Sequence, residues 1–249
     1  MTVSEGGTNL GQGTLTNGAV SVNIGDSLDP GTHTLTVRYA GDARHLESST
    51  TVTLEVRKAS STTTGDASPN RVVVKSGTAT IRVSVISDGA TPTGTVTAFL
   101  NGDQIGSGTV SDGAATFTVG PFGSTGVKTI ELRYSGNDQV AASSTTTDVR
   151  VVKAEPSLDV NIRPGKIKVD KTKATVSIKV TADGFKPNGF VTVKAQGQDE
   201  VRVRLDNGKA EVTLDKFGNT GQKSVKISYE GDDRTESAST TEQIKVVKK

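Results

Sequence analysis

The chain repeats itself at a spacing of 95 residues, and this repeat constrains the fold more than any other feature. A Tyr-x-Gly-Asp or Tyr-x-Gly-Asn motif begins at Tyr39, Tyr134 and Tyr229, which are 95 residues apart. The same offset relates three turn-forming pairs and three lysines: Asn17-Gly18, Asp112-Gly113 and Asn207-Gly208, then Lys58, Lys153 and Lys248. Such a period is too long for a solenoid unit and has the size of a small domain, so it predicts tandem copies of one domain.

The repeat divides the 249 residues into two complete copies and one partial copy. We predict complete domains at residues 59–153 and 154–249, and a partial domain at residues 1–58 that lacks its first strands. Met1 falls at the position that Val96 occupies in the next copy, so the first copy begins inside a strand. Two explanations stay open. Either the sequence begins part-way through a copy, or a partner strand completes the partial domain and the chain self-associates there.

Apolar and polar residues alternate within each copy, which is the pattern of half-buried β-strands. In the middle copy the alternating segments are Ala79–Val85, Val96–Ala98, Ala115–Val119, Ile130–Tyr134 and Val149–Val151, and each has a counterpart in the third copy. The Asn-Gly and Asp-Gly pairs favour hairpin turns because these residues tolerate positive φ. About seven short strands per copy predict an all-β fold of tandem immunoglobulin-like (Ig-like) sandwiches.

The first copy contains no counterpart of the Ala79–Val85 strand. Its remaining strands, which include a segment with Val20, Val22 and Ile24, therefore lack half of a sandwich. We expect Val20, Val22, Leu35 and Val37 to be exposed unless a neighbouring chain or segment covers them.

Three elements of each copy resemble the bacterial Ig-like domain family. They are the Tyr-x-Gly-Asp/Asn motif, the Ser/Thr cluster that follows it and a Val-rich final strand, as in Tyr134–Asn137 followed by Ser143–Thr146. The Pro-x-Gly-x-Val-Thr segments at Pro92–Thr97 and Pro187–Thr192 also fit the family. The resemblance implies tandem Ig-like domains of bacterial surface or secreted proteins, which serve as stalks, adhesins or appendages of enzymes. It also implies an alternative role on phage virions.

The composition excludes several kinds of chemistry. The chain has no cysteine, so it can form no disulfide, thiolate nucleophile, cysteine-ligated zinc site or iron–sulfur cluster. With only two histidines it also cannot form a histidine-rich metal site. No apolar run reaches the roughly 18–20 residues of a membrane span. Residues 1–20 have neither the basic start nor the apolar block of a signal peptide. We expect no cofactor, no membrane span and no enzymatic activity.

The Gly-Asp turns are the only weak candidates for a metal site. Asp42, Asp138, Asp232 and Asp233 could supply the loop oxygens that calcium takes as ligands. The alternative, which we favour, is that Asp or Asn caps a tight turn by accepting hydrogen bonds from backbone N–H groups.

The two histidines offer no catalytic triad. His33 and His45 both lie in the first copy, and lysine replaces His33 at positions 128 and 223 of the later copies. That exchange predicts a solvated surface position for His33.

Basic residues concentrate in the third copy, which has 18 basic and 14 acidic residues and hence a net charge of +4. Lysines gather near its start: Lys166, Lys168, Lys171, Lys173 and Lys179. They could contact an anionic polymer, or they could keep strand edges from pairing, which we favour. Nucleic-acid binding is not expected, because the copies contain no readout helix and no aromatic stacking platform.

A glycan-binding platform would require exposed aromatic residues. It would need Phe99 and Phe190 to be exposed together, which we do not expect. The Ser/Thr clusters, such as Ser60–Thr64 and Ser143–Thr147, are expected to form polar strand faces rather than to carry glycans.

Short linkers complete the prediction. The segments Arg57–Ser60 and Val152–Pro156 contain no Gly/Ser spacer, so neighbouring copies should form a semi-rigid rod. The sequence therefore predicts a non-enzymatic extracellular or cell-surface stalk or adhesion segment, whose partner is a surface polymer or a protein. A phage virion protein that attaches to host surfaces is the alternative.

Overall fold

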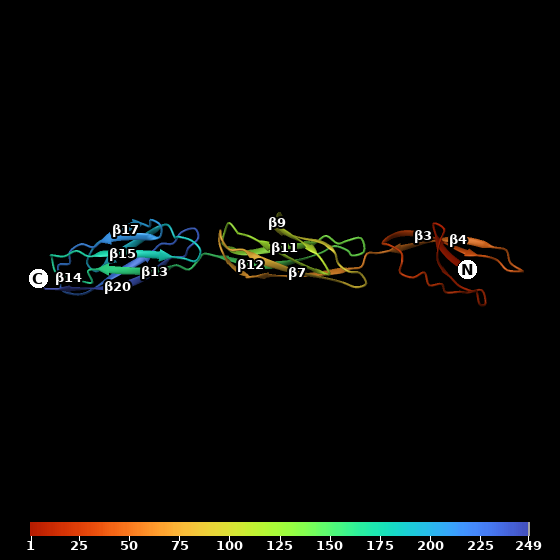
Figure 1. The fold of residues 1–249 in the computed structure, drawn as a ribbon, viewed down its shortest axis with the longest axis horizontal. Helices are drawn as coiled ribbons and strands as arrows, with labels where there is room; N and C mark the ends of the chain where they lie inside the picture. Colours follow the sequence, from red (N-terminus) through yellow and green to blue (C-terminus); the bar gives the residue numbers. More distant parts are fainter. Residues whose placement is uncertain (249) are drawn as a thin grey trace. The chain divides into compact units, whose positions relative to one another are not determined.

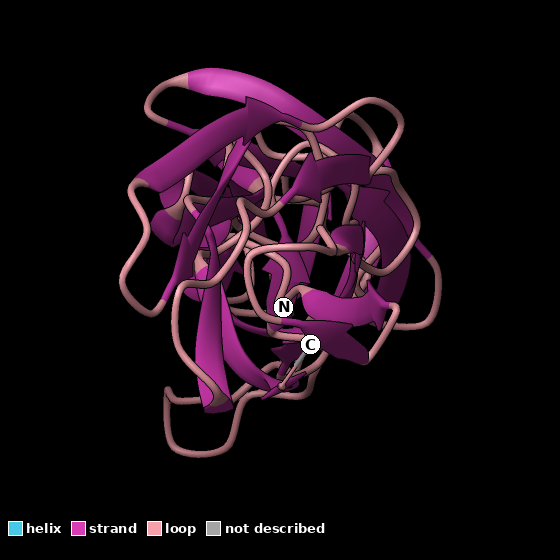
Figure 2. Cartoon of the chain, turned by 90° about the vertical axis from the view of Figure 1, so that its left-hand side faces the viewer, coloured by secondary structure: helices cyan, strands magenta, loops and turns pink. Residues whose placement is uncertain are grey.

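The computed structural model describes residues 1–248 and consists of strands, turns and loops (Figure 2). Its strands follow the repeat: β1–β4 lie within residues 1–58, β5–β12 within 59–153 and β13–β20 within 154–249 (Figure 1). The described part of the chain contains no helix that could cross a bilayer. The predicted all-β class is confirmed.

The middle copy has two sheets. One has three strands in the order β10-β7-β5, and the other has five in the order β6-β12-β11-β8-β9. The strands are β5 (Ser61–Ser68), β6 (Arg71–Val73), β7 (Ala79–Ser87), β8 (Gly94–Leu100), β9 (Asp103–Val110), β10 (Ala114–Val119), β11 (Gly126–Tyr134) and β12 (Ser143–Val152). The five alternating segments predicted from the sequence all lie within strands.

The third copy has the same two sheets, in the orders β13-β15-β18 and β14-β20-β19-β16-β17. Its strands are β13 (Ser157–Arg163), β14 (Lys166–Lys168), β15 (Thr175–Thr181), β16 (Phe190–Ala195), β17 (Glu200–Arg204), β18 (Lys209–Thr213), β19 (Gly221–Tyr229) and β20 (Ala238–Val247). Each complete copy thus has eight strands rather than about seven. The three-residue strands β6 and β14 are too short to show alternation in the sequence.

The alternating apolar residues form the core, as predicted. In the third copy one buried cluster joins the two sheets: Val176 and Ile178 come from β15, and Val225 and Ile227 come from β19. All four side chains are at most 2% exposed. Because a one-residue slip would turn these side chains to water, burial fixes the strand register.

The hairpin turns also form as predicted, in all three copies. Both residues of each pair have positive φ: 50° and 81° at Asn17-Gly18, 48° and 76° at Asp112-Gly113, and 50° and 77° at Asn207-Gly208. Positive φ at both central residues defines the type I′ turn, which Asn-Gly and Asp-Gly favour.

The first copy is a single four-stranded sheet in the order β2-β1-β3-β4. Its strands are β1 (Thr2–Glu5), β2 (Thr8–Gln12), β3 (Gly31–Tyr39) and β4 (Ser48–Val56). At the 95-residue offset they correspond to β8, β9, β11 and β12, so this sheet is the larger sheet of a sandwich without its β6 strand.

One predicted strand of the first copy is absent, and the sequence prediction was wrong there. Residues 20–24 form no strand. Their counterparts at the 95-residue offset lie in β10 of the middle copy and, except for the last residue, in β18 of the third copy. In the complete copies these strands pair with β7 and β15. The first copy has no such neighbour, and a strand needs a hydrogen-bonding partner to persist.

The expected exposure of the first copy is also partly wrong. Leu35 is only 5% exposed, and Val20, Val22 and Val37 are half-buried. The segment that carries Val20 and Val22 lies against β2, because a Cβ added at Gly11 of β2 would be only 2.8 Å from Val22 Cγ1.

Candidate functional site

The Tyr-x-Gly-Asp/Asn motif forms a capped turn after the penultimate strand of each copy. In the third copy Asp232 Oδ1 accepts hydrogen bonds from the backbone N–H groups of Arg234 and Thr235, both at 2.8 Å. Asn137 Oδ1 accepts from the corresponding groups of Gln139 and Val140, at 2.9 and 2.7 Å. The turn-capping interpretation of these residues therefore describes what they do.

Asp42 caps the equivalent turn of the first copy. Its Oδ1 atom accepts from the backbone N–H groups of Arg44 and His45, at 2.8 and 2.9 Å, and Tyr39 donates to Oδ2 at 2.7 Å. The hydrogen bond from Arg44, followed by those from Tyr39 and His45, lowers the pKa of Asp42 to about 2. The carboxylate is therefore ionised at neutral pH, which is the form that accepts these bonds.

The Asp232 carboxylate is partly buried, and two effects oppose each other there. Burial acts to raise the pKa of Asp232. The hydrogen bonds from the backbone N–H groups of Asn188, Arg234 and Thr235 outweigh burial, so the pKa of Asp232 is lowered. The bond from Asn188 comes from the Pro-x-Gly segment and reaches Oδ2 at 2.8 Å.

The two sequence motifs of each complete copy meet at this turn. A Cβ at Gly94 or Gly189, the glycines of the Pro-x-Gly segments, would lie 2.7 Å from the carbonyl oxygen of Gly136 or Gly231. Only glycine permits so close a backbone approach. The two motifs therefore pack against each other in the folded copy, although about 40 residues separate them in the chain.

The linker into each complete copy is bonded to the same turn. Ala59 donates its N–H to the Gln139 carbonyl and accepts from the Ala141 N–H, both at 2.8 Å. Ala154 makes the equivalent bonds to Arg234 and Glu236, at 2.7 and 2.9 Å.

A lysine side chain adds a further bond at each linker. Lys58 Nζ donates to the Asn137 carbonyl, and Lys153 Nζ donates to the Asp232 carbonyl, both at 2.6 Å. This role was not predicted from the sequence. The signal was present, because the Lys-Ala pair recurs at the 95-residue offset.

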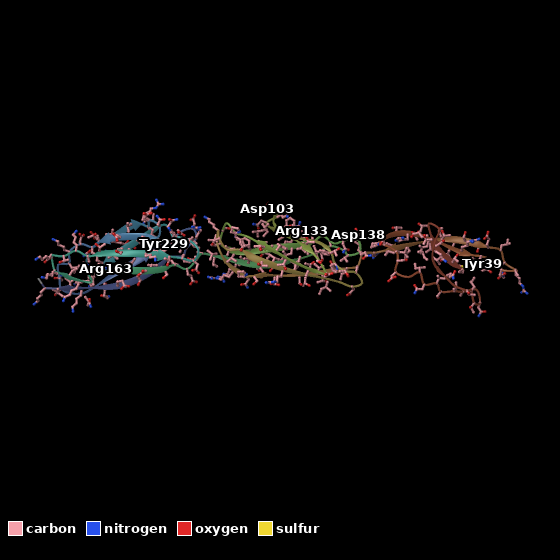
Figure 3. All side chains as sticks on the ribbon, in the orientation of Figure 1. Tyr39, Asp103, Arg133, Asp138, Arg163 and Tyr229 are labelled. Carbon is pink, nitrogen blue, oxygen red and sulfur yellow. The ribbon has the colours of Figure 1, made fainter. Side chains whose placement is uncertain are left out.

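The calcium hypothesis stays an untested prediction. Asp42 and Asp232 use their oxygens to cap backbone N–H groups. Asp138 (Figure 3) is exposed beside the Asn137 cap, and Asp233 is exposed beside the Asp232 cap. Nowhere in residues 1–248 do three or more histidine or acidic side chains group in a way that could hold a metal ion.

The motif tyrosines differ in what their hydroxyl groups bind. The Tyr134 hydroxyl donates to the Thr93 carbonyl at 2.7 Å. The buried Tyr229 hydroxyl has no hydrogen-bond partner in residues 1–248, and neither has the nearby Thr235 Oγ1. Burial raises the pKa of Tyr229 to about 12.

Removal of these hydroxyls should therefore have unequal effects. Tyr134→Phe should lower the free energy of unfolding of the middle copy by about 1 kcal/mol, because it deletes a buried hydrogen bond. Tyr229→Phe should change the third copy by less than about 0.5 kcal/mol, because it deletes a hydroxyl without a partner. Denaturant-dependent hydrogen exchange, which follows each copy separately, measures both. Equal losses in the two copies would contradict the prediction.

The position of His33 differs from the prediction. Its side chain is only 15% exposed, and Nδ1 lies 3.0 Å from Glu5 Oε2. Its Nε2 atom lies 2.7 Å from the Asp29 carbonyl. These two acceptors, Asp29 first and then Glu5, raise the pKa of His33. Both ring nitrogens are engaged, so His33 offers no nitrogen to activate a nucleophile. A salt bridge with a strand neighbour is not visible in alternation patterns.

The two phenylalanines do not form an exposed platform. Phe99 and Phe190 are half-buried, and an arginine covers each ring: Arg133 at 4.5 Å and Arg202 at 3.5 Å from the ring centroids. These are cation–π contacts between neighbouring strands.

The lysines near the start of the third copy separate onto different elements. Lys166 and Lys168 lie on β14, Lys179 lies on β15 of the other sheet, and Lys173 pairs with Asp215 at 3.0 Å.

The Ser/Thr clusters form strand faces as expected, with Ser61 Oγ donating a hydrogen bond to the Ala141 carbonyl at 2.8 Å.

Comparison with known families decides what kind of chain this is. The model of the bacterial Ig-like domain (group 3) matches residues 1–57 and 63–152. The chain belongs to the bacterial Ig-like domain family. The matched residues fall in the first two copies, and the third copy continues the same repeat. None of the curated proteins compared with this family member matches it significantly.

Solved structures similar to this bacterial Ig-like chain share low sequence identity with it. The titin domains z1z2 in complex with telethonin are 17% identical, with a TM-score of 0.43 and coverage of 77% of this chain and 98% of that one. Fibronectin(III)-like modules of Clostridium thermocellum CbhA are 15% identical, with a TM-score of 0.31 and coverage of 76% and 94%. A bacterial ice-binding adhesin is 16% identical, with a TM-score of 0.33 and coverage of 77% and 67%. These values are too low to carry an argument about function.

Proposed function

We propose that the chain is a non-enzymatic structural and adhesion segment of an extracellular or cell-surface protein. It acts as a semi-rigid stalk of Ig-like repeats that spaces or presents other parts of that protein. Membership of the bacterial Ig-like domain family supports this role, because such domains are commonly extracellular or surface-exposed and typically non-catalytic. The tandem arrangement supports the structural part of the role.

The observation that carries the proposal is the near absence of linker residues. Arg57 and Lys58 alone stand between the last residue of β4 and the bridge that Ala59 forms with Val140. Lys153 alone stands between β12 and the bridge that Ala154 forms with Thr235. A linker of one or two residues, with its lysine bonded to the next turn, has little freedom to act as a flexible coil.

Small-angle X-ray scattering of the full chain tests the stalk. Each sandwich is roughly 40 Å long, since strands of up to about ten residues rise ~3.3 Å per residue, so we expect a maximum dimension of about 100 Å. The comparison variant carries about ten Gly/Ser residues inserted after Arg57 and after Val152, which leaves both Lys-Ala pairs intact. Its distance distribution should become broader, because the inserts behave as random coils.

Two outcomes would contradict the proposal. One is a compact particle, in which the copies fold back on one another. The other is a scattering curve that the inserts leave unchanged, which would show that the natural linkers already allow free motion.

A further inference from the structure

The third copy carries its excess positive charge on one sheet face. On the five-stranded sheet, the outward positions of the strands include Lys166, Lys194, Lys226 and Lys245, all exposed. Arg202 and Arg204 extend the basic surface across β17, with Glu200 and Glu230 as the acidic residues of this face. We call the four lysines and their surroundings the basic face.

The opposite sheet of the same copy has no such excess. The outward residues of β13, β15 and β18 include three basic side chains, Arg163, Lys179 and Lys209, and two acidic ones, Asp159 and Glu211. Asp159 stands directly opposite Lys179 in the strand register. Charge on this sheet is therefore nearly balanced, and it serves as an internal reference.

The four lysines form two pairs of like charges on neighbouring strands. Lys166 is opposite Lys245, and Lys194 is opposite Lys226. Like charges placed directly opposite each other destabilise a sheet. None of the four lysines forms an ion pair with a carboxylate in residues 1–248. Glu230, which lies on the same face, is paired with Arg202 at 2.7 Å instead. On its other side Lys194 is opposite Glu200 of β17, which partly compensates that pair although no ion pair forms. Lys166 and Lys245 have no acidic residue opposite either of them, so this unfavourable pair stays uncompensated.

The middle copy shows that one pair is a repeated feature. Arg71 is opposite Arg150 at the place of Lys166 and Lys245, so the positive charge is kept while the residue type changes. At the place of Lys194 and Lys226 the middle copy has Phe99 and Glu131. The second pair, and with it the basic face, therefore belongs to the third copy.

Protection of strand edges does not account for these lysines. The edges of the sheet are β14 and β17, whereas Lys194, Lys226 and Lys245 lie on the interior strands β16, β19 and β20. Interior strands have both neighbours in place and present no unpaired backbone to another chain. The interpretation favoured from the sequence thus holds at most for the lysines of β14.

We infer that the basic face binds an extended, phosphate-bearing polymer of the cell surface. Gln222 of β19 is opposite Lys245, so the pairs lie four residues apart along the strands and two strand spacings apart across them. These offsets amount to about 14 Å and about 10 Å. A small anion cannot bridge them, whereas a linear polymer can contact both pairs.

The residue types suit phosphate and disfavour nucleic acid. Lysine binds phosphate as a compact point charge, and the guanidinium of Arg202 is already paired with Glu230, so the lysines and Arg204 supply the positive charge for a ligand. Nucleic acid would need a ring on which bases stack, and the ring of Phe190 lies beneath Arg202. The inference rests on the proposed function, because it names the partner of the adhesion segment.

Binding of long-chain inorganic polyphosphate to the full chain tests the inference. We expect saturable binding that weakens as salt rises, because the polymer releases counterions when lysines neutralise it. The variant K194Q/K226Q should bind at least fivefold more weakly, and K166Q/K245Q should behave similarly. With all four lysines replaced, the slope of log affinity against log salt should become shallower by about 3, because each phosphate that a lysine neutralises contributes about 0.7 to the slope.

The opposite sheet supplies a matched control. Lys179 and Lys209 are also exposed and stand opposite each other on neighbouring strands. The variant K179Q/K209Q removes the same charge from the same copy, so general attraction by net charge predicts equal losses for both double variants. We expect its affinity to stay within twofold of the wild-type value. Hydrogen exchange of the third copy confirms that each variant is folded.

Three results would overturn the inference: no binding of polyphosphate, an equal loss in the K179Q/K209Q control, or tighter binding of heparin or single-stranded DNA at equal charge. The last result would assign the face to a sulfated glycan or to nucleic acid. Scattering by the unliganded chain is independent of these measurements, so a stalk that fails to bind polyphosphate remains distinguishable from a chain that is not a stalk.

Discussion

Replacement of Gly136 by alanine is expected to lower the free energy of unfolding of the middle copy by about 2–4 kcal/mol. Gly136 has a φ of 72°, where an L-residue costs about 1–2 kcal/mol. An added Cβ would lie 2.7 Å from the Val140 carbonyl oxygen and 2.9 Å from the Ala142 nitrogen, both backbone atoms of the same turn. The turn must shift to admit it, and the shift also strains the hydrogen bonds that Asn137 accepts.

Gly123→Ala provides the matched control in the same copy. A Cβ at Gly123 would have no atom within 4 Å, and its φ is outside the left-handed region. We expect its stability to remain within about 0.5 kcal/mol of the wild-type value. Denaturant titration with hydrogen exchange read for each copy measures both variants. A small effect of Gly136→Ala would show that the turn is pliable and that the motif glycine serves another purpose.

Amide hydrogen exchange is expected to be at least about 100-fold faster in β3 and β4 than in the equivalent strands β11 and β12. The strands occupy the same repeat positions, so each pair has a built-in reference. The buried hydrophobic residues of the first copy are Val3 and Leu35, whereas the middle copy buries hydrophobic residues from both of its sheets. Val52, on the inner face of β4, is 50% exposed. A sheet covered so little has a small free energy of opening, and exchange reports that free energy.

The mass of the particle must be measured in the same sample. Fast exchange in a monomer supports the description of the first copy as half of a sandwich. Slow exchange in a dimer or a larger assembly would contradict the prediction. It would show that a second chain covers the sheet, and self-association through residues 1–58 would become the leading function.

Much of the fold could be predicted from local patterns. Alternation of apolar and polar residues correctly placed strands such as β7 and β15, because the side chains of a strand point to opposite faces with a period of two. Asn-Gly and Asp-Gly correctly predicted the type I′ turns, because their φ preferences act within two residues. The turn at Asn17-Gly18 forms even where the strand after it does not.

The candidate sites depended on contacts that no local pattern contains. The capping role of Asp232 was predicted, since an Asx turn spans only three residues. The approach of Gly189 to Gly231 was not predicted, and neither was the bond from Lys153 to the same turn. These contacts join segments about 40 to 80 residues apart in the chain.

The repeat, the turns, and the longer strands of the complete copies with their core faces follow from the amino-acid sequence alone, because short-range periodicity and backbone preference set them. Which strands find partners depends on the tertiary structure. Residues 20–24 have the right alternation and remain outside any sheet, since their neighbouring strand is missing.

The distribution of charge over the two sheets also depends on the tertiary structure. The lysines of the third copy look like one cluster in the sequence, but pairing sends them to two sheets and places Lys194 beside Lys226. Strand pairing brings together residues that are far apart in the chain, and for that reason no local pattern reveals it.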